Sequence, residues 1–167
     1  MDEKRLSNNL GFTLIELIVV FSIMAILSSV GIASFVSYSR SQSIQTAASN
    51  LELTLELAKS RASSQVKPSQ CLGALSGYQV DILSVTTYSL SVFCPEVHLV
   101  QTVTLPDSGN IKFDLGVGQT TTNSVFFPVI TSGVRGSGNI ILTGYNQSRW
   151  VCIDSRGIIK TLASPCP

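Results

Sequence analysis

The feature that most constrains this chain is a long uncharged stretch near its N-terminus. Between Arg5 and Arg40 the only charged residue is Glu16, and residues 17–39 carry no charge at all. An α-helix needs roughly 20 apolar residues to cross a bilayer, so this stretch has the length of a membrane span. Ser and Gly within it are compatible with a span, because small residues favour helix–helix contact in lipid.

A secretory signal peptide and a plain membrane anchor are the two ordinary explanations of such a stretch. A signal peptide has an apolar region of about 7–15 residues, followed by a small-x-small cleavage site. Here the apolar region is longer, and residues 33–35 offer no convincing site. A plain anchor has the right length but leaves Glu16 unexplained. A carboxylate near hydrocarbon is costly unless it is paired, so an acid at this position indicates a function.

Cleavage of the chain after Gly11 accounts for Glu16. Phe12 then becomes the new N-terminus, and its α-amine is expected one helical turn from Glu16, at positions i and i+4. Glu16 is also expected in the first turn of the helix, where the helix dipole favours a negative charge. In a filament, the Glu16 carboxylate of one subunit would pair with the α-amine of a neighbour. That pairing neutralises both charges and fixes the axial register.

Around this junction the sequence reads Gly11-Phe12-Thr13-Leu14-Ile15-Glu16, which resembles the processing motif of type IV pilins and type II secretion pseudopilins. The resemblance implies a cytoplasmic leader, residues 1–11, that a membrane aspartic peptidase removes after Gly11 before Phe12 is N-methylated. It implies that residues 12–36 anchor the chain in the bacterial inner membrane as a single transmembrane pass. The N-terminus is then cytoplasmic and the head periplasmic, until the subunit enters a filament. The implied partners are the prepilin peptidase and methyltransferase, other pilins or pseudopilins contacted through the helix, and the inner-membrane assembly platform.

The predicted helix continues beyond the uncharged stretch. There is no Gly or Pro from Arg40 to Gln65, and apolar residues recur at spacings of three, four and seven. That spacing is typical of an amphipathic helix with one buried stripe. We therefore expect residues 37–65 to form an amphipathic half that ends near residues 63–65, ahead of Pro68. The stripe consists of Ile44, Ala47, Ala48, Leu51, Leu55, Ala58 and Ala62.

Residues 66–167 have the pattern of a β-rich globular head. Short runs rich in β-branched and aromatic residues alternate with Gly, Asn, Asp, Ser and Pro. Their spacing of about 8–12 residues is typical of an antiparallel sheet or a small two-sheet sandwich. The predicted fold class is therefore α+β and pilin-like, with a long N-terminal helix packed on the head. The predicted strands are Tyr78–Leu83, Tyr88–Phe93, Leu99–Thr104, Asn110–Leu115, Val125–Ile130, Asn139–Leu142, Arg149–Asp154 and Ile158–Leu162.

Two further segments resemble the family that contains pseudopilin H and the FimT-type minor pilins. One is the helix end from Leu51 to Ala62, and the other, from Trp150 to Lys160, is similar to that family's terminal hairpin. The resemblance implies a structural subunit, not an enzyme, that initiates or caps a type IV pilus or a type II secretion pseudopilus. It also raises an alternative, a DNA-binding minor pilin for natural transformation.

The DNA-binding alternative depends on basic residues near the C-terminus. Minor pilins of that kind carry a Gly-Arg-x-Arg motif. Aligned on Gly157, this chain has Gly-Ile-Ile-Lys at residues 157–160, so the first Arg is missing and Lys160 replaces the second. Arg149, Arg156 and Lys160 would supply a small phosphate-binding patch in its place.

The four cysteines, Cys71, Cys94, Cys152 and Cys166, indicate disulfides, because an even count in a chain that leaves the cytoplasm favours them. Four cysteines permit three pairings, and the sequence does not choose among them. Proximity along the chain favours Cys71–Cys94 and Cys152–Cys166. The sequence contains no CxxC pair, a single histidine, His98, and no Gly-x-Ser-x-Gly elbow. We therefore expect no metal site, no cofactor and no catalytic residue.

Overall fold

The computed structural model describes residues 12–115, 122–130 and 133–167. In these residues one helix, α1 (Leu14–Ser63), precedes eight strands. The chain divides into two compact units, Met1–Ser39 and Arg40–Pro167, with the division inside α1. The strands are β1 (Gly77–Ile82), β2 (Thr87–Phe93), β3 (Val97–Thr104), β4 (Lys112–Asp114), β5 (Ser124–Pro128), β6 (Gly138–Gly144), β7 (Gln147–Ile153) and β8 (Ile159–Leu162).

The first unit contains the N-terminal part of α1. Its apolar side chains are exposed, for example Phe21 at 67% and Leu27 at 68%. Among the described residues, no helix combines the length and the apolar character that a membrane crossing requires. The span over residues 12–36 therefore stays a prediction.

The end of α1 is closed by backbone hydrogen bonds. Gln65 has a positive φ of 51°. Its N–H donates to the carbonyl of Ala62 at 3.1 Å, and the N–H of Val66 donates to the carbonyl of Arg61 at 3.0 Å. This pair of bonds is a Schellman motif, which satisfies carbonyl groups that the last turn leaves without helical partners. The helix ends at Ser63, within the range that the sequence predicts.

The second half of α1 turns its predicted stripe inward. All seven stripe residues are at most 1% exposed, whereas Leu53, which lies between two of them, is 66% exposed. Four of the seven are alanines, and their small side chains let the sheets approach the helix backbone closely. The stripe residues are Ile44, Ala47, Ala48, Leu51, Leu55, Ala58 and Ala62.

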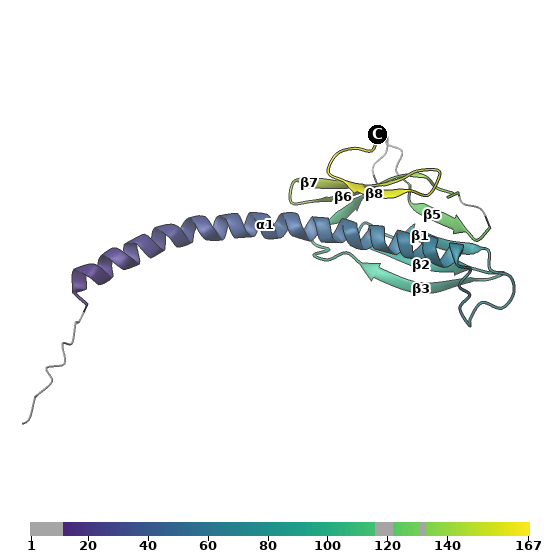
Figure 1. Ribbon diagram of the computed structural model, residues 1–167, viewed down its shortest axis with the longest axis horizontal. Coiled ribbons are helices and arrows are strands. Elements are labelled where there is room, and N and C mark those ends of the chain that lie inside the picture. Colours follow the sequence, from purple (N-terminus) through teal and green to yellow (C-terminus); the bar gives the residue numbers. More distant parts are fainter. Residues whose placement is uncertain (1–11, 116–121, 131–132) are drawn as a thin grey trace, which may run out of the picture. The chain divides into compact units, whose positions relative to one another are not determined.

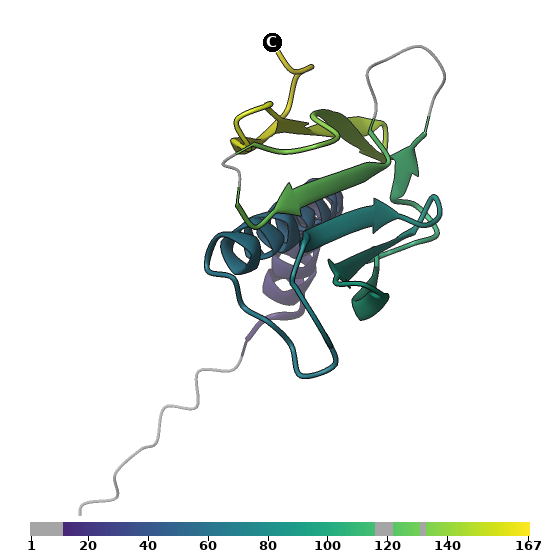
Figure 2. The same cartoon turned by 90° about the vertical axis from the view of Figure 1, so that its right-hand side faces the viewer.

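The strands form two four-stranded sheets, in the orders β3-β2-β1-β5 and β4-β6-β7-β8. All pairings are antiparallel. The second half of α1 lies alongside both sheets, with β6–β8 on one side of it and β1–β3 on the other (Figure 1; Figure 2). One hydrophobic cluster joins the helix stripe to side chains of both sheets. The prediction of an α+β fold is confirmed, and the head has the two-sheet form.

Polar contacts also hold α1 against the second sheet. The Thr161 hydroxyl on β8 donates to Glu52 Oε2 at 2.6 Å, and Arg149 Nε on β7 donates to Gln45 Oε1 at 2.8 Å. Hydrogen bonds to charged groups contribute about 1.5–3 kcal/mol each when they are shielded from water. Because both bonds are directional, they fix the rotation of the helix about its axis.

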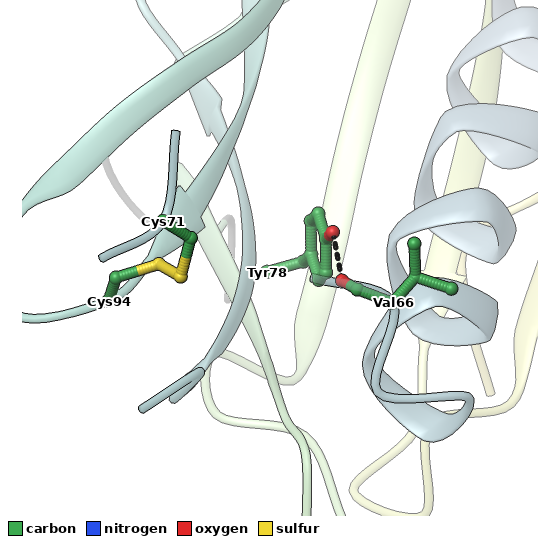
Figure 3. The surroundings of a disulfide bond; sticks show 4 residues. All are labelled: Val66, Cys71, Tyr78 and Cys94. Carbon is green, nitrogen blue, oxygen red and sulfur yellow. Dashed lines mark hydrogen bonds between the residues drawn. A yellow bond between two sulfur atoms is a disulfide. The ribbon is translucent and has the colours of Figure 1, made fainter. Parts of the chain in front are cut away.

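Two disulfides, Cys71–Cys94 and Cys152–Cys166, lie in the head, and in each the Cα atoms are 5.8 Å apart. The first joins the segment that follows α1 to the residue after β2. Figure 3 shows it near Tyr78, whose hydroxyl donates to the Val66 carbonyl at 2.6 Å. Burial raises the pKa of the Tyr78 phenol. The hydrogen bond and the disulfide together fix the chain just after the helix.

Candidate functional site

The N-terminal junction is the first candidate site. Gly11, the predicted residue before the cleaved bond, lies outside the described residues. Phe12 is described, does not belong to α1 and is 75% exposed. The helix begins two residues later, at Leu14. In this uncleaved chain Phe12 precedes the helix, and the i, i+4 relation expected after cleavage at Gly11 stays a prediction.

Thr13 caps the helix and was not singled out by the sequence analysis. The Glu16 backbone N–H donates to Thr13 Oγ1 at 3.3 Å, and the Leu17 N–H donates to the Thr13 carbonyl at 3.3 Å. Thr13 is thus the N-cap, and Glu16 occupies the third helical position. The pattern Thr-x-x-Glu before an apolar run is the sequence signature of a capping box, so this role was readable from the sequence.

Glu16 lies in the first turn of α1 and is exposed. A carboxylate there is stabilised by the unpaired N–H groups and the positive end of the helix dipole. In this single chain its side chain faces outward among exposed apolar neighbours, such as Leu17 at 46% and Val20 at 42%. The position gives a negative charge on an otherwise apolar helix surface, where a cation from another molecule can reach it.

The three basic residues of the predicted phosphate patch do not lie on one face. Arg149 faces α1, since its Nε atom donates to Gln45. Lys160 pairs with Cys152 in the sheet register, and that position is on the opposite side of the β7–β8 pair from Val151 and Thr161. The structure therefore separates Arg149 from Lys160 by the thickness of the sheet.

Arg156 and Lys160 do come together. Both line a cavity of ≈ 810 Å³ beside the Cys152–Cys166 disulfide. Arg156 Nε donates to Asp154 Oδ2 at 2.8 Å, and the arginine side chain is 79% exposed. The hydrogen bond from Arg156, with a second from Ser155, lowers the pKa of Asp154. The Asp154 carboxylate partly neutralises the Arg156 charge. The net positive charge offered to an anionic ligand in this cavity is therefore smaller than the sum of Arg156 and Lys160.

Potential metal ligands do not cluster in residues 12–115, 122–130 and 133–167. Within these ranges no group of three or more His, Cys, Asp or Glu residues is placed to hold a metal ion. His98 lies in β3, paired with Val92 of β2.

Comparison with known proteins gives one match. Residues 6–32 match the family model described as the prokaryotic N-terminal methylation motif. No curated protein and no solved structure shows a match to the chain. The matched segment includes the Gly11–Phe12 junction, the Thr13 cap and Glu16. The chain therefore carries a prepilin-type methylation motif, and this match, together with a long helix packed on an antiparallel β head, supports placing it in the type IV pilin and pseudopilin superfamily.

Proposed function

We propose that this protein is a minor pilin or pseudopilin, a structural subunit that initiates or caps a type IV pilus or a type II secretion pseudopilus. The observation that carries the proposal is the methylation motif over residues 6–32. The fold supports it, because the amphipathic half of α1 is bound to the head while the apolar half is left with exposed side chains. An exposed apolar helix of this kind needs a lipid or protein environment.

Processing creates a positively charged partner for the Glu16 carboxylate. A prepilin peptidase cuts after Gly11, and the Phe12 amine that results is N-methylated. In the assembled filament, the Glu16 carboxylate of one subunit pairs with that amine of a neighbour. The pair is worth most in an apolar bundle, where the effective dielectric constant is low and an unpaired charge is costly. The contact would therefore set the axial register and reject unprocessed subunits.

Before assembly, residues 12–36 hold the subunit in the inner membrane as a single pass. Residues 17–39 carry no charge, and their length matches a bilayer. The leader, residues 1–11, would stay in the cytoplasm with Lys4 and Arg5, and the head would lie in the periplasm. Both disulfides fit that placement, because disulfides persist in the bacterial periplasm and are rare in the cytosol. Partners are the peptidase and methyltransferase, the assembly platform, and other subunits through α1.

Glu16→Ala in the producing cell tests the assembly role. Glu56→Ala is a matched control: it removes the same group from the same helix, where Glu56 makes only an exposed ion pair with Lys59 at 3.6 Å. We expect Glu16→Ala to be processed but absent from sheared filaments, and Glu56→Ala to be incorporated normally. Mass spectrometry of the mature chain should find methylated Phe12 at its N-terminus. Another N-terminus, or normal incorporation of Glu16→Ala, would refute the proposal.

DNA binding by the head is the second candidate function. It is supported by Arg156 and Lys160, which line one cavity, but not by Arg149, which is held against α1. A gel shift of the full chain in detergent at low salt tests it, with Lys67→Gln as a charge-matched control. DNA uptake as the function predicts a shift that Arg156→Gln and Lys160→Gln weaken and Lys67→Gln does not. No shift, or equal effects of all three substitutions, would exclude this site.

A further inference from the structure

The β6–β7 turn is attached to Arg40, the first charged residue after the uncharged stretch. The turn consists of Tyr145 and Asn146, which have φ values of 52° and 59°. Positive φ at both central residues is the geometry of a tight type I′ hairpin turn. The Arg40 guanidinium carbon lies 5.4 Å from the centre of the Tyr145 ring, in a cation–π contact. The hairpin tip is thereby fixed to the helix at residue 40.

A second turn, residues 107–111, packs against the first. A Cβ atom added to Gly144 would lie 3.0 Å from the Asn110 carbonyl oxygen, so the two backbones are in close contact. The Thr143 hydroxyl donates to the Lys112 carbonyl at 3.4 Å. Together the two turns enclose a shallow, polar cavity of ≈ 390 Å³. We call this end of the head the proximal rim: Arg40, residues 107–112 and residues 143–149.

The proximal rim carries a small excess of positive charge. Arg40 and Lys112 are exposed, and Arg149 is partly buried beside the turn. Asp107 is the acid at this end, and its carboxylate accepts a hydrogen bond from Asn110 Nδ2 at 3.0 Å. Asp114 lies further along β4, opposite Ile141. Arg149 is held against α1 by its bond to Gln45, so the exposed cations of the rim are Arg40 and Lys112. Against the one carboxylate of Asp107 they leave the rim with a net positive charge.

The sequence fixes where this rim would lie in a membrane-anchored subunit. Arg40 follows directly on Ser39, the last residue of the uncharged stretch. If that stretch occupies hydrocarbon, Arg40 reaches the water interface, where Arg side chains near helix ends extend toward water and Tyr side chains are enriched. Tyr145 and the two turns are held to Arg40, so they lie at the same depth. Anionic lipid attracts basic groups near its surface, and the attraction falls off within a Debye length.

We propose that the proximal rim docks on anionic phospholipid headgroups while the subunit waits in the membrane for assembly. The inference rests on the proposed membrane anchor but goes beyond it, since an anchored helix does not by itself require the head to touch lipid. Docking limits the orientations of the head above the bilayer. It is released when the subunit is extracted into a filament and the rim leaves the lipid surface.

Hydrogen exchange of the full-length chain in lipid nanodiscs tests this inference. One set of discs contains phosphatidylcholine alone, and the other contains phosphatidylcholine with phosphatidylglycerol. We expect amides of residues 107–112 and 143–149 to exchange about fivefold more slowly in the anionic discs. A fivefold change corresponds to the attraction of about 1 kcal/mol between one basic side chain and an anionic lipid surface. Added salt at about 0.5 M shortens the screening length on the order of threefold relative to low salt. It should therefore remove the difference in exchange rate between the two kinds of disc.

Substitutions separate the rim from general charge effects. Arg40→Gln and Lys112→Gln should each reduce the difference between the discs, whereas Lys160→Gln, which removes a charge far from the turns, should keep it. Equal exchange in both discs, with residues 17–39 protected, overturns docking and leaves the anchor intact. Rapid exchange of residues 17–39 in both discs overturns the anchor, and with it the proposed function. Unchanged exchange in the β1–β2 core shows that each variant is folded.

Discussion

Leu55→Ala and Leu53→Ala form a matched pair that tests how α1 packs on the head. Leu55 is 0% exposed and sits in the stripe that faces the sheets, whereas Leu53, two residues earlier, is 66% exposed. The two substitutions remove the same atoms from the same helix. Their effects on helix propensity therefore cancel in the comparison, and the difference in unfolding free energy reports burial alone.

The expected magnitudes follow from that burial. Truncation of a fully buried leucine costs about 3 kcal/mol, because it loses the transfer free energy and leaves a cavity. Leu53 keeps about a third of its surface buried, so its truncation should cost less than about 1 kcal/mol. We therefore expect a difference of at least about 2 kcal/mol between the two variants.

Urea unfolding of a fragment of residues 40–167 measures the difference. That unit contains the whole hydrophobic cluster and both disulfides. With an m-value of about 2 kcal/mol/M, Leu55→Ala should lower the unfolding midpoint by about 1.5 M, and Leu53→Ala by under about 0.5 M. Equal midpoints for the two variants, or a larger loss for Leu53→Ala, would show that the helix is rotated from the position described.

Three further predictions concern a disulfide, a buried tyrosine and the helix cap. Replacement of Cys152 and Cys166 by Ser, which opens a loop with a sequence separation of 14 residues, should cost about 3 kcal/mol in urea unfolding. Burial raises the pKa of Tyr88, so the unfolding free energy should be fully present below about pH 10, the pKa of an unfolded tyrosine, and fall as the pH rises above it. Tyr88→Phe should flatten that dependence in pH-jump denaturation. Thr13→Ala should destabilise the first turn of α1 by about 1 kcal/mol. Hydrogen exchange of the full chain in micelles should then show faster exchange of the amides in that turn.

Each of these has its own control. Reduction of the wild-type fragment opens both disulfides, so it should lower the unfolding free energy by more than the Cys152/Cys166 replacement does, and a smaller loss would question the loop-entropy estimate. A profile above pH 10 that is equally steep in Tyr88→Phe would assign the titration to another group. Thr13→Ser keeps the capping oxygen, so exchange in this variant should match the wild type. If Thr13→Ser exchanged as fast as Thr13→Ala, the hydroxyl would not be the cap.

Much of the fold could be predicted because the chain's local patterns agree with its tertiary packing. The stripe from Ile44 to Ala62 has a clear helical spacing, and every member is buried. Most of the eight strands have distinct boundaries because Gly, Asn, Asp or Pro separates them, and most observed ends lie within one or two residues of the predicted ones. The shortest, β4 (Lys112–Asp114), is three residues shorter than predicted, since the ladder there pairs only three residues with β6, and β6 (Gly138–Gly144) is three residues longer than predicted.

Other features depend on pairings that a linear pattern does not encode. Whether eight strands make one sheet or two is decided by which edges hydrogen-bond, and β5 leaves its sequence neighbours to pair with β1. The separation of the predicted phosphate-binding residues also depends on how the strands pair. Arg149 and Lys160 come from paired strands, but strand alternation and register place them on opposite faces. By contrast, the Thr13 cap depends on the local Thr-x-x-Glu pattern alone and required no tertiary information.

The Cys71–Cys94 disulfide has a mechanical consequence for any subunit that is pulled by its helix. Tension that passes along the backbone beyond Val66 reaches Cys71 and crosses the sulfur bridge to Cys94, without stretching the chain between them. The bridge excludes a sequence separation of 23 residues, or about 80 Å of extended chain at roughly 3.5 Å per residue. The excluded segment contains the whole of β1 and β2, the two central strands of the first sheet. An oxidised head under load can therefore lengthen far less than a reduced one before its sheet is lost.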